Sequence, residues 1–234
     1  DNSGNVYFGT NDKRIAKLDT QTNTVYWYDF AGSNSNISYP YDMVMGPNNE
    51  VYFSAGGAVA KFNFDTDTFT RFSSLNSALT FEGTHCESPM VFDSSGNLYA
   101  VSNGKVICKI DFSSNTVTYW NLQPLENSAV YIDSLDIDQN NNMFVTLETH
   151  QKVARIDQSS NIVTTWLIPD VTDGPHDIAA DSSGNVFFSA NNNLWRLVPA
   201  TDTFTKWSSF SAYSLNLNGE NLWILNPTEV WKLT

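Results

Sequence analysis

Three histidines provide all the imidazole groups of the 234-residue chain: His85, His150 and His176. Each lies close in sequence to a carboxylate. Glu148 comes two residues before the second histidine, and Asp177 directly follows the third. A histidine beside a carboxylate can accept or donate a proton during catalysis, and carboxylate oxygens are ligands for Mg²⁺ and Ca²⁺. The chain therefore holds groups for acid/base or cation chemistry, provided that the fold brings them together.

A repeat of about 45 residues decides where these groups lie, because it covers the whole chain. Its most regular part is a turn followed by a short apolar run, and the first five starts are 45, 47, 45 and 43 residues apart. The six segments are DNSGNVYF (1–8), GPNNEVYF (46–53), DSSGNLYA (93–100), DQNNNMFV (138–145), DSSGNVFF (181–188) and NGENLWI (218–224).

Each repeat unit has the pattern of four short strands joined by turns rich in Asn, Gly, Ser and Asp. The strands are rich in Val, Ile, Phe, Tyr and Trp, which favour β structure. Repeated four-stranded units of this length are typical of a β-propeller, whose blades surround a central channel. We therefore predict an all-β fold with a single domain over residues 1–234, a six-bladed β-propeller of four-stranded antiparallel blades.

The first and last blades are predicted to be incomplete. The first unit lacks its first strand, and the last unit lacks its fourth strand. An unpaired strand edge is a template for pairing with another strand. We expect either that the sequence is a fragment of a longer chain, or that a neighbouring molecule covers an edge through strand-mediated self-association.

Two sets of residues recur at one position of the blades and are therefore predicted to be structural. An aromatic residue in the fourth strand favours packing between blades over a sugar-binding row: Tyr28, Phe72, Trp120, Trp166 and Trp207. A basic residue recurs in the third strand of each unit, and this set makes up half of all the Lys and Arg side chains, which argues against a basic patch. Its members are Lys17, Lys61, Lys109, Arg155, Arg196 and Lys232. Cys108 falls at a core position, and a disulfide with Cys86 is left open.

The three histidines map to one face of the predicted propeller. In an antiparallel blade, the hairpin after the second strand and the connection to the next blade lie at the same end, here called the top face. The first residue of each innermost strand lies at the channel mouth on this face: Tyr41, Ser88, Asp133, His176 and Tyr213. These positions vary among blades although the repeat around them does not, and such variation indicates function.

We therefore predict that the top face binds a ligand or partner at the channel mouth. The candidate binding residues are Tyr41, Asp42, His85, Glu87, His150, Asp177, Asn191 and Tyr213. Polar residues that fill a solvated funnel would give the same pattern, so both interpretations stay open.

The pattern P-x-x-I-x-x-D-x-x-G-N-V-x-F, followed by K/R-I-D, resembles the streptogramin B lyase (virginiamycin B lyase) propellers and, more loosely, NHL-repeat propellers. The segment GPHDIAADSSGNVFF is the closest match, and the repeat resemblance spans the whole chain. Those lyases act on a cyclic depsipeptide with Mg²⁺. They use a histidine in an E-P-H-G turn, a glutamate that ends the following W-F-x-x-E strand, and another histidine one blade earlier.

These residues carry over to the present chain only in part. His176 falls on the E-P-H-G histidine, but Gly174 stands at the position of the glutamate in that turn. Asn191 replaces the strand-ending glutamate, and Asp133 replaces the histidine of the earlier blade. Glu148 occupies a strand-ending glutamate position, one blade too early. If the chain is an enzyme, Asp133, Glu148 and His176 are the expected acid/base or cation site, with Mg²⁺ or Ca²⁺ at the channel mouth.

Charge and composition narrow the class of partner. The formal net charge of −13 argues against binding to nucleic acid and to anionic membrane surfaces. No apolar run approaches the ~20 residues of a membrane helix, so no membrane insertion is expected. Abundant Asn, Ser and Thr with scarce Lys favour an extracellular or cell-surface location.

The predicted function is that of a secreted or cell-surface propeller that binds a small molecule or protein at its top face or serves as a structural module. The alternative is a metal-assisted lyase or hydrolase related to streptogramin B lyase. A third interpretation, a calcium-dependent lactonase-like enzyme, would need several carboxylate and Asn side chains that converge in the channel, and the candidates are Asp133, Glu148 and Asn191.

Overall fold

The computed structural model describes residues 1, 3–29, 40–55, 58–64, 66–72, 80–81, 84–102, 104–122, 130–208, 212–219 and 221–233. The chain divides into two compact units, residues 1–120 and 121–234, and each is described by itself. A single domain over residues 1–234 therefore stays a prediction.

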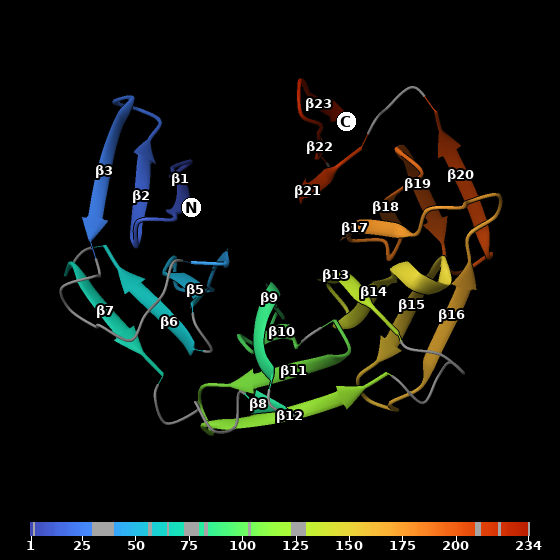
Figure 1. The fold of residues 1–234 in the computed structure, drawn as a ribbon, viewed down its shortest axis with the longest axis horizontal. Coiled ribbons are helices and arrows are strands. Elements are labelled where there is room, and N and C mark those ends of the chain that lie inside the picture. Colours follow the sequence, from blue (N-terminus) through green and yellow to red (C-terminus); the bar gives the residue numbers. More distant parts are fainter. Residues whose placement is uncertain are drawn as a thin grey trace. The chain divides into compact units, whose positions relative to one another are not determined.

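Six antiparallel sheets contain the described strands, and their order follows the chain (Figure 1). The first unit has the sheets β1 (Val6–Thr10), β2 (Arg14–Asp19), β3 (Thr24–Asp29); β4 (Asp42–Met45), β5 (Val51–Ala55), β6 (Ala58–Asn63), β7 (Thr68–Arg71); and β8 (Thr80–Phe81), β9 (Thr84–Phe92), β10 (Leu98–Ser102), β11 (Val106–Asp111), β12 (Thr116–Asn121). The second unit has the sheets β13 (Ile132–Ile137), β14 (Asn142–Leu147), β15 (Lys152–Asp157), β16 (Val163–Leu167); β17 (Pro175–Ala180), β18 (Val186–Ala190), β19 (Asn193–Val198), β20 (Thr203–Trp207); and β21 (Ser214–Asn218), β22 (Asn221–Leu225), β23 (Val230–Leu233).

The fold is a six-bladed β-propeller, as the repeat predicts, and its first and last blades have three strands each. The third blade departs from the prediction because it has a fifth strand. Strand β9 is nine residues long, and its first residues pair with β8 through Thr80↔His85 and Phe81↔Thr84. No helix in the described part of the chain is long and apolar enough to cross a membrane.

An aspartate shapes the turn that leads into the second strand of four blades. Asp181 is representative: its Oδ1 accepts the backbone N–H groups of Ser183 and Asn185, both at 2.8 Å, and its Oδ2 accepts Asn185 Nδ2 at 2.7 Å. Gly184 takes a φ of +77°, which glycine adopts without steric cost. The other members of the set are Asp1, Asp93 and Asp138. These bonds fix the register between turn and strand, and with it which side chains face the core.

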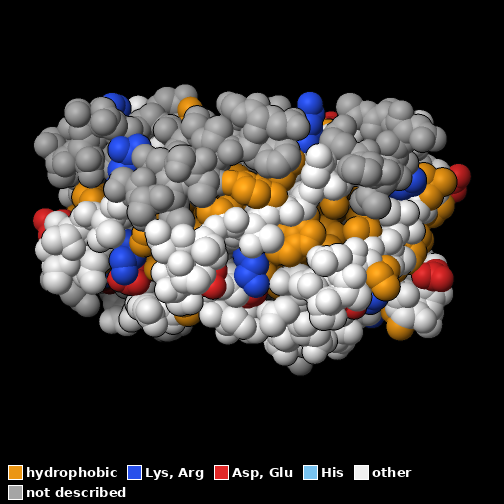
Figure 2. Space-filling view, turned by 90° about the horizontal axis from the view of Figure 1, so that it is seen from below, with side chains coloured by type: hydrophobic (Ala, Val, Ile, Leu, Met, Phe, Trp, Pro, Cys, Tyr) orange, Lys and Arg blue, Asp and Glu red, His pale blue; other side chains and the backbone are white. Residues whose placement is uncertain are grey.

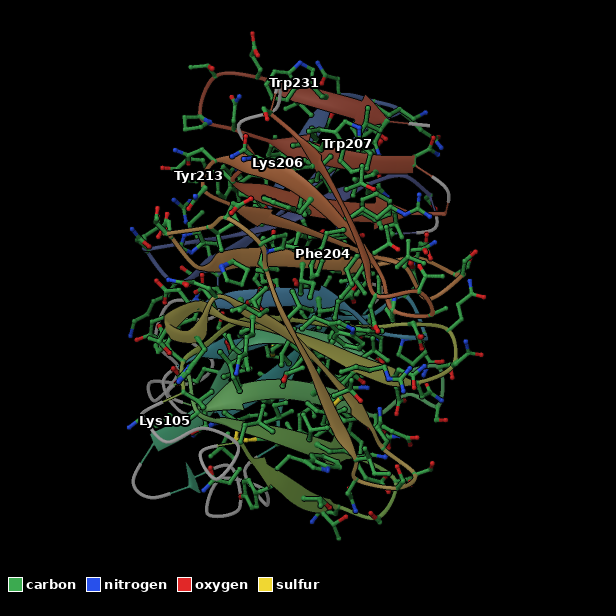
Figure 3. The ribbon with its side chains drawn as sticks, turned by 90° about the vertical axis from the view of Figure 1, so that its right-hand side faces the viewer. Lys105, Phe204, Lys206, Trp207, Tyr213 and Trp231 are labelled. Carbon is green, nitrogen blue, oxygen red and sulfur yellow. A yellow bond between two sulfur atoms is a disulfide. The ribbon has the colours of Figure 1, made fainter. Side chains whose placement is uncertain are left out.

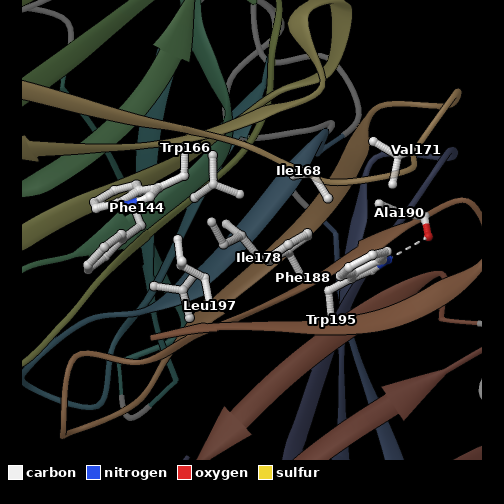
Figure 4. Close-up of a cluster of buried hydrophobic side chains, with 11 residues drawn as sticks. Phe144, Trp166, Ile168, Val171, Ile178, Phe188, Ala190, Trp195 and Leu197 are labelled. Carbon is white, nitrogen blue, oxygen red and sulfur yellow. Dashed lines mark hydrogen bonds between the residues drawn. The ribbon is translucent and has the colours of Figure 1, made fainter. Parts of the chain in front are cut away.

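Neighbouring blades share their apolar cores. In the second unit, Trp166 and Ile168 from one blade pack with Ile178 and Phe188 of the next, together with Trp195 (Figure 4). Trp195 is oriented by a hydrogen bond of 3.2 Å from its Nε1 to the Ala190 carbonyl. The prediction that fourth-strand aromatics pack between blades is therefore confirmed for Trp166, which is 8 % exposed.

Other fourth-strand aromatics behave in the same way. Trp207 on β20 packs against the cluster of the last blade that contains Leu215 and Leu222 (Figure 3). In the first unit, the Tyr28 ring lies 4.7 Å from that of Phe62.

The basic residue of each third strand lies directly opposite an aromatic residue of the second strand. The pairs are Tyr7↔Lys17, Tyr52↔Lys61, Tyr99↔Lys109, Phe144↔Arg155, Phe187↔Arg196 and Trp223↔Lys232. In three of them the cation lies 5.6–5.9 Å from the ring centroid, within range of a cation–π contact. On the face drawn in Figure 2, basic side chains stand apart from one another among acidic and uncharged ones.

The two cysteines form a disulfide between β9 and β11. Cys86 is 1 % exposed and Cys108 is 0 % exposed, so the bond lies inside the third blade. This settles the pairing that the sequence left open.

Reduction of this disulfide should lower the free energy of unfolding by about 3 kcal/mol, because the bond closes a separation of 22 residues in the unfolded chain. Thermal melts with and without dithiothreitol measure the effect. The Cys86→Ala/Cys108→Ala double variant is the control, since dithiothreitol should leave its melting temperature unchanged. An equal response of both proteins to the reductant would contradict the prediction.

Candidate functional site

His176 lies at the start of β17, where the pairing with β18 shifts between Pro175 and Ile178. Its Nδ1 lies 2.8 Å from Oδ2 of Asp133, which belongs to β13 of the preceding blade. Its Nε2 lies 3.4 Å from Oδ2 of Asp173, three residues earlier in the chain. The side chain is 41 % exposed. The ring of His176 is thus partly exposed and bonded to Asp133, which holds the same position one blade earlier.

Two opposing effects act on the His176 imidazole. Burial favours its neutral form, but the hydrogen bonds and negative charges of Asp133 and Asp173 outweigh burial and raise the pKa of His176. A larger fraction of the imidazolium is therefore present near neutral pH than in an isolated histidine, and the charged ring can donate from both nitrogens.

A pocket of about 350 Å³ opens beside this ring. It is lined by Asp173, His176, Ala190, Asn192, Ala212 and Tyr213. Tyr213, labelled in Figure 3, is 63 % exposed and precedes β21. The lining combines an acid, an imidazole, an amide and a phenol with two small apolar side chains, so it can hold a ligand by both polar and apolar contacts.

A buried hydroxyl group fixes the backbone that carries His176. The Thr146 hydroxyl, which is fully buried, donates to the His176 carbonyl at 3.0 Å and accepts the Ser134 N–H at 2.8 Å. The histidine is thus attached to the preceding blade through its backbone as well as through its ring.

Asp177, a predicted binding residue, is occupied by structural bonds. Its Oδ1 accepts the Ile178 N–H at 2.9 Å and the Ser134 hydroxyl at 2.8 Å. Its Oδ2 accepts the Ser214 hydroxyl at 2.9 Å and the Leu215 N–H at 2.7 Å. The carboxylate therefore joins three consecutive blades, and its four hydrogen bonds leave little capacity for a ligand.

Gly174 stands where the resembling lyases have glutamate, and the local packing explains why a side chain is absent. A Cβ on this residue would lie 2.0 Å from the Glu148 carbonyl oxygen and 2.6 Å from its carbonyl carbon. The obstacle is backbone of the 3-10 turn Glu148–His150 in the preceding blade, which cannot swing aside as a flexible side chain could.

Asn191 occupies the position of the strand-ending glutamate and has a local structural role. Its Oδ1 accepts the backbone N–H groups of Thr172 at 3.2 Å and Asp173 at 2.6 Å. Asn191 and Asn192 both have positive φ, which Asn tolerates better than most residues. The Asn191 side chain thus holds the loop that presents Asp173 to His176.

Two other predicted residues of the second unit, Glu148 and His150, lie in the 3-10 turn of the preceding blade. Glu148 makes no hydrogen bond with His176, and the ring of His150 bonds the Thr149 hydroxyl at 2.9 Å. Asp42 repeats the bridging role of Asp177, since its carboxylate accepts the Met43 and Met90 N–H groups at 2.8 and 2.6 Å. The remaining ones belong to the first unit and are described only within it: Tyr41, which is 49 % exposed, Glu87, and His85, whose side chain lies outside the described part.

The sequence did not single out two acids that matter here. Asp173 was missed because it belongs to an irregular connection, although its place three residues before His176 is a usable signal. Asp136 on β13 was missed because it looks like any polar residue of a strand. It accepts the Ile137 and Ala180 N–H groups at 2.8 and 2.7 Å. Burial, opposed by these two bonds and reinforced by the charges of Asp177 and Asp138, raises the pKa of Asp136 to about 6.

The residues do not fit the Mg²⁺ site that the resemblance implies. Among the described residues, no group of three or more His, Cys, Asp or Glu side chains is arranged to hold a metal ion. Asn191 directs its oxygen at two backbone N–H groups, and the glutamate that would follow from the E-P-H-G turn is absent.

Comparison with known proteins supports the fold. No protein-family model matches the chain, and no curated protein matches it in sequence. Among solved structures, virginiamycin B lyase from Staphylococcus aureus has a TM-score of 0.73 at 20 % identity, covering 94 % of this chain and 73 % of that one. A catalytically inactive variant of that lyase with quinupristin gives 0.76 at 19 % identity, covering 95 % and 74 %.

A different kind of protein shares the fold as well. A domain described as the extracellular domain of a hybrid two component system from B. thetaiotaomicron has a TM-score of 0.75 at 14 % identity. The match covers 100 % of this chain and 32 % of that one. At these identities the comparisons show a shared propeller fold, which lyases and extracellular domains have alike. A function for this chain therefore has to be argued from its site residues.

Gly174→Ala should destabilise the protein by about 2–4 kcal/mol, because the added Cβ collides with backbone atoms of Glu148. Chemical denaturation measures the loss. Gly219→Ala is the matched control: a Cβ there meets nothing within 4 Å, and only its φ of +62° opposes the change, for a cost of about 1 kcal/mol. Equal free energies of unfolding for the two variants would contradict the prediction, because they would show that the hairpin containing Glu148 shifts to accommodate the added Cβ.

Ionisation of Asp136 should weaken the fold as the pH rises from about 4 to 6. Its pKa is about 6 when folded and near 4 in an unfolded chain, so the folded state favours the protonated form, and the full cost above pH 6 is up to about 3 kcal/mol. Asp136→Asn carries no titratable group. Relative to wild type, it should gain about 1–3 kcal/mol between pH 4 and pH 7 in denaturation experiments. A stability difference that is independent of pH would contradict the assignment.

Proposed function

We propose that the chain is an extracellular binding module whose ligand occupies the pocket beside His176. The observation that carries the proposal is the ring of His176, held between Asp133 and Asp173 and exposed to a pocket that Tyr213 also lines. Hydrogen-bonding groups and small apolar side chains together are typical of sites for small molecules. The ring is fixed in place by two carboxylates before any ligand arrives, which lowers the entropic cost of binding.

Three observations favour binding over lyase chemistry. The position of the turn glutamate has no room for a side chain. The position of the strand-ending glutamate is an asparagine engaged with the loop. The carboxylate that follows His176 in sequence is used to join blades. Proton abstraction from a substrate needs an acid and a base placed together, and these three positions supply neither beside the histidine.

One observation favours the alternative, a metal-assisted lyase or hydrolase. The hydrogen bond between His176 and Asp133 raises the pKa of the imidazole, and an imidazolium near neutral pH can act as a general acid. Asp133 stands where the resembling lyases have their other histidine, so the pair would be a rearranged form of that site.

An extracellular location is part of the proposal. It is supported by the buried disulfide, since such bonds persist in oxidising compartments. It is also supported by the shared fold with an extracellular domain from B. thetaiotaomicron. Self-association by strand pairing stays a proposal too: β1 and β23 are edge strands of their three-stranded sheets, and sedimentation velocity would detect a dimer.

His176→Ala should weaken ligand binding by roughly 10- to 100-fold, because a charged hydrogen-bonding group is lost. Quinupristin is the first probe, since a structure of the same fold holds it. Calorimetry gives the affinity. The melting temperature should change little, because the ring is 41 % exposed and fills no core.

His150→Ala is the matched control, since this ring belongs to the neighbouring hairpin, has its Nδ1 2.9 Å from the Thr149 hydroxyl and does not line the pocket. It should bind quinupristin like the wild type. Equal binding by the wild type and the His176→Ala variant would contradict the proposal. Mass spectrometry after incubation with Mg²⁺ should find quinupristin unchanged, whereas a ring-opened product would favour the enzymatic alternative.

A further inference from the structure

A second pocket lies at the opposite end of the strands from His176. It has a volume of about 240 Å³ and lies between the turn that precedes β14 and the turn that precedes β18. Arg155 on β15 belongs to its lining, together with Asp138, Asn140, Ser183, Val198 and Ala200. All residues from 130 to 208 are described, so the surroundings of this arginine in both blades are complete.

Arg155 has no partner among the described residues. Its Nε is buried without a hydrogen bond, and its guanidinium forms no ion pair with the part of the chain that the structure describes. A buried donor without an acceptor costs about 1–3 kcal/mol, and a guanidinium carries five N–H donors. The carboxylate in the same pocket, Asp138, is engaged elsewhere: it accepts the N–H groups of Asn140 and Asn142 and the Asn142 side-chain amide.

The second blade shows what this cation binds when the chain supplies a partner. Lys61 occupies the position of Arg155 in the repeat, opposite the aromatic residue of the second strand. Its Nζ lies 2.8 and 3.0 Å from the two carboxylate oxygens of Glu50, the last residue of the preceding turn. The fourth blade has Asn142 at the position of Glu50. Asn also stands at this position in the other four blades, as Asn5, Asn97, Asn185 and Asn221, so the repeat places a carboxylate before the cation in the second blade alone.

We propose that the Arg155 pocket binds the carboxylate of a small hydroxylated acid, of the class of the uronic acids. The planar guanidinium matches a carboxylate in bidentate geometry. The Asn140 amide and the Ser183 hydroxyl make no side-chain hydrogen bond with described residues, so they are available to ligand hydroxyls. Val198 and Ala200 supply an apolar wall.

The net charge of −13 does not oppose such binding strongly. Exposed charges further than about 8 Å away are largely screened at physiological ionic strength. The nearest acid, Asp138, directs both oxygens into its own turn. The site is separate from the His176 pocket and does not depend on the function proposed for it.

Titration with D-glucuronate, followed by NMR at the Nε–H resonance of Arg155, tests the proposal. Loss of the signal in Arg155→Gln assigns it. We expect a saturable shift in the wild type and affinity at least tenfold weaker in Arg155→Gln, measured by calorimetry. Arg14→Gln is the charge-matched control, since it removes one cation from an exposed pair with Asp12 in the first unit. The Arg14→Gln variant should bind D-glucuronate with the affinity of the wild type, and so should the His176→Ala variant.

D-glucose lacks the carboxylate and should leave the Arg155 resonance unmoved, whereas acetate should shift it at higher concentration. The proposal is overturned if the wild-type resonance does not move up to about 50 mM glucuronate, an affinity too weak to matter. It is also overturned if glucose or inorganic phosphate shifts the signal as strongly as glucuronate, or if Arg155→Gln binds as tightly as the wild type. Should that variant fail to fold, the wild-type titration with the four probes still decides.

Discussion

In four blades, a carboxylate that accepts three hydrogen bonds from its own turn sets the register on which the rest of the blade depends. Asp181 and its equivalents bind two backbone N–H groups and one side-chain amide within five residues. In the second blade the aspartate is absent, but the turn keeps the backbone bond that the turns of Asp93, Asp138 and Asp181 also have, since Gly46 donates to the Glu50 carbonyl at 2.8 Å. With the register fixed, apolar side chains face the neighbouring blade, and the aromatic and basic residues of adjacent strands come to stand opposite each other. A shift by one residue would turn every one of these side chains to the wrong face.

In the second unit, polar side chains of the innermost strands form hydrogen bonds that connect one blade to the next. Asp177 joins the blade of β13, its own blade and the blade of β21, while Asp136 reaches the backbone of β17. His176 lies within this network, attached at its ring and at its carbonyl. A side chain held by supports of this kind keeps its geometry before any ligand is bound. The arrangement also explains why several acids near the histidine are unavailable for chemistry.

Topology made part of the site predictable. Asp133 and His176 occupy the same position in consecutive blades, so the repeat alone brings them together. Other parts depend on contacts that no local pattern encodes. Asp177 resembles a ligand-binding acid in sequence, but its partners include Leu215, which is 38 residues further along the chain. The short strand β8 was missed because its pairing depends on the extra length of β9. The fold was predictable because the same local chemistry recurs six times, whereas the site is built where the blades differ.

The close approach of Gly174 to the Glu148 carbonyl has a consequence for how this chain can evolve. The hairpin of one blade occupies the space that a side chain of the next would need. A glutamate at position 174 would therefore be selected against until the hairpin had moved, and a moved hairpin brings no advantage until the glutamate is present. The two changes are epistatic, each harmful or neutral without the other. Substitution is less restricted at Tyr213, whose side chain is 63 % exposed beside the same pocket, than at Gly174.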